Sequence, residues 1–157
     1  MIGFFCNVAL ALAWVALSGS FTALNFLTGF IFAFLALMVL QNHVPVLNGY
    51  AKRIGRIIAF VFYFLQELIK ANFRVAYDVA TPVWYMKPGV IGFPLEAQTD
   101  VEIMFLSSVI SLTPGTLSLD ISDDRKVLYI HAMFLQDEEG LRRDLKELEH
   151  RLLQIMR

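Results

Sequence analysis

The chain has 157 residues, of which 57% are hydrophobic, a mean hydropathy of +0.61 and a net charge of −1. This composition is typical of a small membrane protein with one soluble module, and without a clustered basic patch it argues against a nucleic-acid binder. The single cysteine, Cys6, excludes an intramolecular disulfide framework and a cysteine-based zinc site.

Charged residues are distributed unevenly along the sequence. The first one is Lys52, so residues 1–51 contain no Lys, Arg, Asp or Glu. Residues 1–89 carry six basic and two acidic residues, whereas residues 90–157 carry seven basic and twelve acidic ones. We therefore expect a membrane segment, a basic segment beside the membrane, and an acidic soluble domain.

Residues 1–41 are predicted to form two transmembrane helices. Two apolar runs, residues 1–17 and 21–40, are separated by Ser18-Gly19-Ser20. Each run is long enough to cross a hydrocarbon core of about 30 Å, and the short break allows only a tight helical hairpin. A signal peptide is the alternative for the first run, but its charged n-region is missing and a second apolar run follows at once.

Small and polar residues interrupt the two apolar runs. Asn7 and Asn25 are predicted to make hydrogen bonds between helices rather than to bind ions. Gly19 and Gly29 allow close helix packing. These four positions are candidate structural or partner-contact residues.

Residues 42–82 are expected to form a connector and an amphipathic helix. The helix should begin near Arg53 and end before Thr81-Pro82, because a proline disfavours helix at the preceding residue. Polar and apolar residues recur on it at spacings of three and four. The polar stripe contains Tyr63, Gln66, Glu67, Lys70, Arg74, Tyr77 and Asp78. The apolar stripe contains Ile58, Val61, Phe62, Leu65, Leu68, Ile69 and Phe73.

The short apolar core of this helix favours a helix lying along the membrane interface over a third full span. In that arrangement all six basic residues of the first 89 stay on one side, which would be the cytoplasmic side, together with the soluble domain. Glu67, Lys70 and Arg74 are candidate ion-path or interfacial charges. They either carry ions or lie on the wet face as local helical pairs, and the sequence leaves both interpretations open.

Residues 83–157 are predicted to form a small α+β cytoplasmic domain with the order strand-helix-strand-strand-helix. An edge strand covers residues 90–97, and a capping box formed by Thr99 and Glu102 opens the next helix. A hairpin spans residues 116–134, and a last helix covers residues 137–155. Helix 101–112 should carry Val101, Met104, Phe105, Ser108, Val109 and Leu112 on one face. The first hairpin strand should bury Leu117, Leu119 and Ile121.

The sequence contains no motif of a known reaction. A glycine-rich phosphate loop, a G-x-S-x-G elbow and an H-E-x-x-H motif are all missing. We therefore predict no enzyme activity, no catalytic or cofactor-binding residues and no metal site. Pro114 and Gly115 are expected to stop a helix before a strand, and they are also candidate partner-contact residues.

Several segments together resemble one family. These are Lys87-Pro88-Gly89-Val90-Ile91, Thr99-Asp100-x-Glu102, Leu112-Thr113-Pro114-Gly115-Thr116, Leu119-Asp120-Ile121-Ser122 and Tyr129-Ile130-His131. In this context the chain resembles the E subunits of the Mrp (Mnh or Pha) family of bacterial multisubunit monovalent cation/proton antiporters. The resemblance extends over essentially the whole chain.

The resemblance implies a place in a complex of six or seven different subunits in the bacterial cytoplasmic membrane, which exchanges Na⁺ or K⁺ for H⁺. It implies that larger subunits translocate the ions and that this chain is an accessory, structural subunit whose partners are other subunits and membrane lipid. Two alternatives remain: a self-sufficient small oligomeric transporter that uses Glu67, and a membrane-tethered ligand-sensing module.

Overall fold

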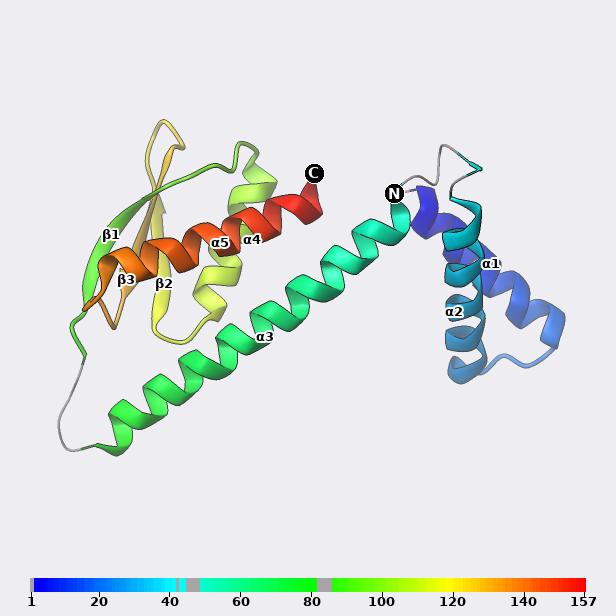
Figure 1. The fold of residues 1–157 in the computed structure, drawn as a ribbon, viewed down its shortest axis with the longest axis horizontal. Helices are drawn as coiled ribbons and strands as arrows, with labels where there is room; N and C mark the ends of the chain where they lie inside the picture. The colour runs from blue at the N-terminus through cyan, green and yellow to red at the C-terminus, as the bar shows by residue number, and fades with distance from the viewer. Residues whose placement is uncertain (1, 42, 45–48, 82–85) are drawn as a thin grey trace. The chain divides into compact units, whose positions relative to one another are not determined.

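The computed structural model describes residues 2–41, 43–44, 49–81 and 86–157 (Figure 1). The chain forms two compact units, residues 1–57 and 58–157. Part of the predicted connector, residues 42 and 45–48, lies outside the described residues, as does Pro82. The division into segments 1–41, 42–82 and 83–157 stays a prediction.

The first unit contains a helical hairpin of α1 (Ile2–Ser18) and α2 (Ala23–Leu40). Both helices bury mainly small residues at every fourth position: Gly3, Asn7, Ala11 and Val15 on α1, and Gly29, Ala33 and Leu37 on α2. A Cβ atom added to Gly29 would lie 2.8 Å from ring atoms of Trp14, so only glycine fits this contact. The spacing and the small side chains let the two backbones approach closely, as in helix pairs within membranes.

The outward faces of this hairpin are apolar. Among the described residues, α2 is the one helix with the length and apolarity of a membrane span, and α1, with 17 residues, is a shorter apolar helix. Large hydrophobic residues such as Phe5, Leu17, Phe21 and Leu24 are exposed. The hairpin therefore presents to its surroundings a surface that water solvates poorly.

Helix α3 (Tyr50–Ala80) has 31 residues and ends where the sequence predicts, although it begins three residues before Arg53. Its two predicted stripes are present. Within the second unit, Phe60, Tyr63 and Phe64 pack against the hydrophobic core. Most of the apolar stripe is exposed: Ile58, Val61, Phe62, Leu65, Ile69 and Phe73.

The second unit also contains a small α+β fold, in the order that the sequence predicts. Its elements are β1 (Gly89–Pro94), α4 (Asp100–Leu112), β2 (Thr116–Ile121), β3 (Val127–Ala132) and α5 (Glu138–Met156). The sheet is antiparallel with the strand order β1-β3-β2, which confirms β1 as an edge strand. Strand β1 ends at Pro94 rather than at residue 97, because the amides of Glu96 and Ala97 donate to the Glu149 carboxylate instead of to a strand.

One face of the sheet carries the hydrophobic core. Residues from two strands and two helices meet there: Ile91, Phe93, Leu106, Ile110, Leu128, Ile130, Leu145, Leu148 and Leu152. The opposite face exposes Val90, Leu117 and Tyr129. The helices therefore cover one face of the sheet, as the sequence predicts.

The stripe predicted on α4 shares one face, which is the outer one, whereas the prediction of the buried side of β2 is wrong. Helix α4 buries Ile103, Leu106 and Ile110. The stripe expected from the sequence lies on the outer side of α4. Of its apolar residues, Val109 is half-buried and the others are exposed. The side chains of β2 that were expected to be buried, Leu117, Leu119 and Ile121, are exposed.

The register of β2 explains this error. Leu117 lies opposite His131, on the face away from the buried Ile130, before the register with β3 shifts between Ser118 and Asp120. Ser118 lies opposite the buried Ile130 and donates from its Oγ to the Ser107 carbonyl of α4 at 3.1 Å. A polar residue therefore takes the inward position between β2 and α4.

Both edges of the sheet have side-chain partners. On β2, the Ser118 N–H donates to Ser111 Oγ at 3.1 Å. On β1, the Gly92 carbonyl accepts from Arg142 Nη1 at 2.8 Å. Occupied edge groups hinder pairing with a strand of another chain.

Candidate functional site

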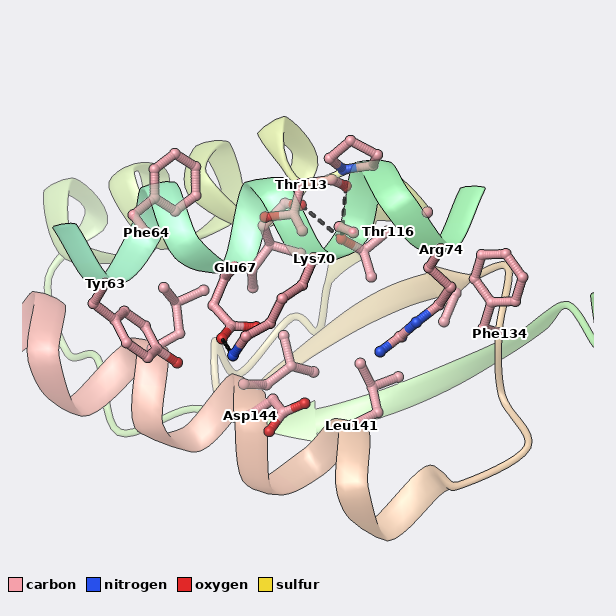
Figure 2. Close-up of a pocket in the computed structure, with 17 residues that line it drawn as sticks. Tyr63, Phe64, Glu67, Lys70, Arg74, Thr113, Thr116, Phe134, Leu141 and Asp144 are labelled. Carbon is pink, nitrogen blue, oxygen red and sulfur yellow. Dashed lines mark hydrogen bonds and ion pairs between the residues drawn. The ribbon is translucent and has the colours of Figure 1, made fainter. Parts of the chain in front are cut away.

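A cavity of about 100 Å³ lies in the second unit, where α3 meets the α+β fold (Figure 2). Helix α3 supplies four residues of its polar stripe together with Phe64 and Ala71. The segment that joins α4 to β2 supplies a corner, and α5 supplies apolar residues and one acid. The lining residues include Tyr63, Phe64, Glu67, Lys70, Arg74, Thr113, Pro114, Gly115, Thr116, Phe134, Leu141 and Asp144.

The charged side chains in the cavity are arranged as a compensated group. Lys70 Nζ lies 2.6 Å from Glu67 Oε1. Asp144 of α5 faces this pair in Figure 2. Burial raises the pKa of the Asp144 carboxyl, and the nearby Glu67 adds to this, while Arg74 and Lys70 oppose it. Two acids and two bases thus balance each other, which favours attachment of α3 over binding of a strongly charged ion.

Aromatic rings hold α3 at both ends of this group. The guanidinium of Arg151 lies 4.5 Å from the centre of the Tyr63 ring, and that of Arg74 lies 5.9 Å from the centre of the Phe134 ring. Cation–π contacts of this kind contribute roughly 0.5–1 kcal/mol at exposed positions. The structure therefore brings Glu67, Lys70 and Arg74 together on the side of α3 that faces the fold, and their role in ion movement stays a prediction.

Pro114 and Gly115 line the same cavity and turn the chain from α4 into β2. Gly115 has a φ of +91°, which favours glycine, and its carbonyl accepts from the Met133 N–H at 2.8 Å. Thr116 Oγ1 donates to the Ile110 carbonyl at 2.8 Å, which closes the end of α4. The corner is a helix stop before a strand, as expected, and its contact with a partner stays a prediction.

The remaining sequence-predicted positions lie in the first unit. Asn7 is fully buried, and its Nδ2 donates to the Tyr50 hydroxyl at 3.1 Å. Asn25 accepts from Trp14 Nε1 at 3.0 Å and donates to Ser18 and Ser20. Both asparagines therefore bond to other helices, as expected.

The two glycines of the hairpin have separate roles. Gly19 adopts a φ of +67° in the break between α1 and α2, and Gly29 packs against Trp14. A positive φ is readily adopted only by glycine, so Gly19 permits the turn. Contacts of these positions with other subunits stay predictions.

Glu149 and Glu102 are buried carboxylates of the second unit, and the sequence pattern singled out Glu102 only as a helix cap and Glu149 not at all. Glu149 is 1% exposed, and its Oε1 accepts from the amides of Glu96 and Ala97 at 2.8 and 2.9 Å. Its Oε2 has no hydrogen-bond partner among the described residues, and burial raises the pKa of this carboxyl. The helical spacing could have indicated that Glu149 is buried, since it follows Leu145 by four residues and so falls on the apolar face of α5.

Glu102, the second of these carboxylates, completes the predicted capping box and also holds the end of the chain. The box with Thr99 is formed, and Arg157 Nε donates to Glu102 Oε1 at 2.9 Å. The hydrogen bond from Arg157 and that from the Gln98 amide lower the pKa of Glu102 from 4.5 to about 2. This group therefore stabilises the fold above about pH 4.5, and the stabilisation is lost as the pH falls toward 2.

A metal centre finds no support in the described part of the chain. No group of three or more His, Cys, Asp or Glu side chains there is placed to hold a metal ion.

Comparison with known proteins gives consistent matches. The family described as Na⁺/H⁺ ion antiporter subunit matches residues 7–155. The chain is 39% identical over 147 residues to the E subunit of the Na⁺/H⁺ antiporter of Alkalihalophilus pseudofirmus, covering 94% of this chain and 92% of that protein. It is 40% identical over 148 residues to the corresponding E subunit of Bacillus subtilis, covering 94% and 93%.

A solved structure agrees with these relatives. A chain in the structure of the Mrp complex from Dietzia sp. DQ12-45-1b is 30% identical, with a TM-score of 0.51, over 65% of this chain and 96% of that chain. The resemblance noted in the sequence is therefore confirmed, and the chain belongs to the family of Na⁺/H⁺ antiporter E subunits.

Proposed function

We propose that this protein is an accessory, structural subunit of a multisubunit Na⁺ (or K⁺)/H⁺ antiporter complex in the bacterial cytoplasmic membrane. The observation that carries the proposal is the match with antiporter E subunits along nearly their whole length and nearly the whole of this chain. The similarity to a chain of an Mrp complex supports the same conclusion. Its partners are the other subunits of the complex and membrane lipid, and it needs no cofactor.

The arrangement of charges favours assembly over transport chemistry or catalysis. Glu67 is neutralised by Lys70, and Glu102 by Arg157. Apolar side chains are exposed on α1, α2, α3 and α4, so each of these helices offers a surface for lipid or for another subunit. A chain with paired charges and many apolar surfaces suits a subunit that positions others.

The membrane arrangement that we propose has two spans and one interfacial helix. The hairpin of α1 and α2 crosses the membrane, since its small-residue contact and its apolar outer faces both suit a lipid environment. Helix α3 lies along the cytoplasmic interface with its apolar stripe in the lipid and its polar stripe against the α+β fold. The soluble domain is then cytoplasmic.

Purification of the complex tests this function. A tag on the carboxyl end of this chain should recover the larger subunits from mild detergent, and membranes that lack the chain should lose Na⁺/H⁺ exchange, measured as dequenching of a ΔpH dye in inverted vesicles. The purified chain alone, reconstituted in liposomes, should exchange nothing. Recovery of the chain without any other antiporter subunit would refute the proposal.

A transport role for Glu67 is the second candidate, because the structure places a second carboxylate, Asp144, beside it (Figure 2). Two neighbouring acids are a common way to hold a proton. The variant Glu67→Gln removes the charge and keeps the shape. We expect the assembled variant complex to retain exchange, equal to that of the control Glu139→Gln, whose residue is 90% exposed at its side chain. Loss of exchange with intact assembly would instead assign Glu67 a role in transport.

A further inference from the structure

Helix α4 is apolar on both its inner and its outer side. Its inner side enters the core through Ile103, Leu106 and Ile110. Its outer side exposes Val101 (55%), Met104 (56%), Phe105 (48%) and Leu112 (64%), which we call the outer α4 stripe. Contiguous exposed apolar side chains of this kind mark interaction sites, so this stripe is a candidate docking surface.

A groove continues the outer α4 stripe toward the β2–β3 hairpin. Met104 lies both in the stripe and in the groove, and Ile103 and Ile121 add apolar surface there. Asp100, Ser107, Ser122, Asp123 and Arg125 line the rest of the groove. An apolar stripe beside a shallow groove is the form that receives an amphipathic helix or an extended apolar segment.

The rim of this surface carries two acidic residues, Asp100 and Asp123, against one basic residue, Arg125. Arg125 Nη1 already donates to Asp100 Oδ1, so Asp123 gives the rim its net negative charge. The apolar stripe of α3 differs, because the basic residues Lys52, Arg53 and Arg56 lie near the start of the same helix. Basic flanks suit the anionic surface of a membrane, whereas an acidic rim is repelled by it.

We infer that the outer α4 stripe and its groove dock a cytoplasmic segment of another subunit of the same complex, in which apolar side chains are flanked by Lys or Arg. Cytoplasmic loops of membrane proteins carry an excess of these two residues. The apolar side chains of such a segment would contact the outer α4 stripe, and its Lys or Arg residues would contact the acidic rim. A second copy of this chain fits less well, since it would bring two acidic rims together. The inference rests on the proposed function.

Photo-crosslinking within the intact complex tests the inference. A benzophenone amino acid replaces Phe105 or Leu112 in the tagged full chain, and the membranes contain all subunits of the antiporter. Matched controls carry the same group at Phe62 on the apolar stripe of α3 and at Glu139 on α5. We expect positions 105 and 112 to link to one cytoplasmic segment of another subunit, with Lys or Arg next to the linked residue, as mapped by mass spectrometry.

The charge of the rim supplies a second measurement. Asp123→Lys should lower the crosslinking yield from position 105 by about fivefold, as expected for a reversed charge at an exposed interface, and Glu139→Lys should leave it unchanged. The inference would be overturned if the crosslinking yield did not respond to Asp123→Lys, or if it did not exceed the yield from position 139. Crosslinks from positions 105 and 112 to lipid or to a second copy of the chain would overturn it as well. If the larger subunits fail to co-purify with the unaltered chain, the proposed function fails instead, so the two failures are distinguishable.

Discussion

The carboxyl group of Glu149 lies on the apolar side of α5 and shapes the loop that follows β1. Its Oε1 accepts two backbone amides, those of Glu96 and Ala97, and these bonds turn the chain away from the sheet. Its Oε2 is buried without a partner among the described residues, and burial raises its pKa above the usual 4.5. An acid with a raised pKa stabilises the fold fully below about pH 4.5, and this contribution is lost as the pH rises through the folded-state value.

Replacing Glu149 with Gln should change the pH dependence of stability. The Gln side chain keeps the accepting oxygen but cannot ionise. We expect the free energy of unfolding of Glu149→Gln to improve relative to the unaltered chain as the pH rises from about 5 to about 8. Denaturant unfolding of the full chain in detergent, with hydrogen exchange of the Glu96 and Ala97 amides, measures this.

A companion variant separates the charge from the hydrogen bonds. Glu149→Leu removes the acceptor and should cost about 1–3 kcal/mol for each of the two amides left unsatisfied. Its destabilisation should be present at every pH. A difference between Glu149→Gln and the unaltered chain that stays constant with pH would show that Glu149 binds equally many protons in the folded and unfolded states, and so would contradict a raised pKa in the folded state.

At the scale of the helical hairpin, a single contact decides how closely α1 and α2 approach. A Cβ atom at Gly29 would lie 2.8 Å from Trp14, whereas one at Gly55, also within a helix, would meet nothing within 4 Å. The two positions therefore form a matched pair. Replacing either glycine with Ala makes the backbone less flexible and so favours the helix, but only Gly29 is tightly packed.

Gly29→Ala should destabilise the hairpin by about 1–3 kcal/mol, the usual cost of forcing an extra methyl group into a well-packed contact. Gly55→Ala should be neutral or stabilising by up to roughly 1 kcal/mol, because Ala favours helix over Gly. Thermal unfolding of the full chain in detergent, followed by circular dichroism, measures both. Equal midpoints for the two variants would contradict the close packing of α1 and α2.

The sequence predicts elements whose signals are local. The capping box of Thr99 and Glu102, the two hairpin strands and the end of α3 before Thr81 all depend on neighbouring residues, and the structure has each of them. Helix α4 has no such signal for its orientation. Because its inner and its outer side both carry large apolar residues, periodicity cannot choose between them, and packing against β3 and α5 decides which side is buried.

The sequence predicts the residues that α3 contributes to the candidate site, but not those that other elements contribute. Glu67, Lys70 and Arg74 share one side of the helix because they are spaced by three and four residues. Asp144 and Phe134 join them from other elements, through docking of α3 that no local pattern encodes. Such contacts between distant segments depend on the tertiary fold.

For the whole molecule, the length and the two faces of α3 bear on its membrane arrangement. Its 31 residues extend about 45 Å at 1.5 Å per residue, more than the hydrocarbon core of about 30 Å requires. Its polar stripe lies against the α+β fold within the second unit, and a full span would place these charges in lipid. An interfacial helix leaves residues before and after α3 on the same side of the membrane.

Labelling of single cysteines distinguishes these arrangements. With Cys6 replaced by Ser, one cysteine is placed at the start of α3, Lys52→Cys, or on the exposed start of α5, Glu139→Cys. A membrane-impermeant maleimide should label both variants in inverted vesicles and neither in right-side-out vesicles, because an interfacial α3 keeps both positions in the cytoplasm. A cysteine-free chain controls for background, and detergent-opened vesicles show that each site can react. Labelling of the two positions from opposite sides would instead require α3 to cross the membrane, since only a third span separates residue 52 from residue 139.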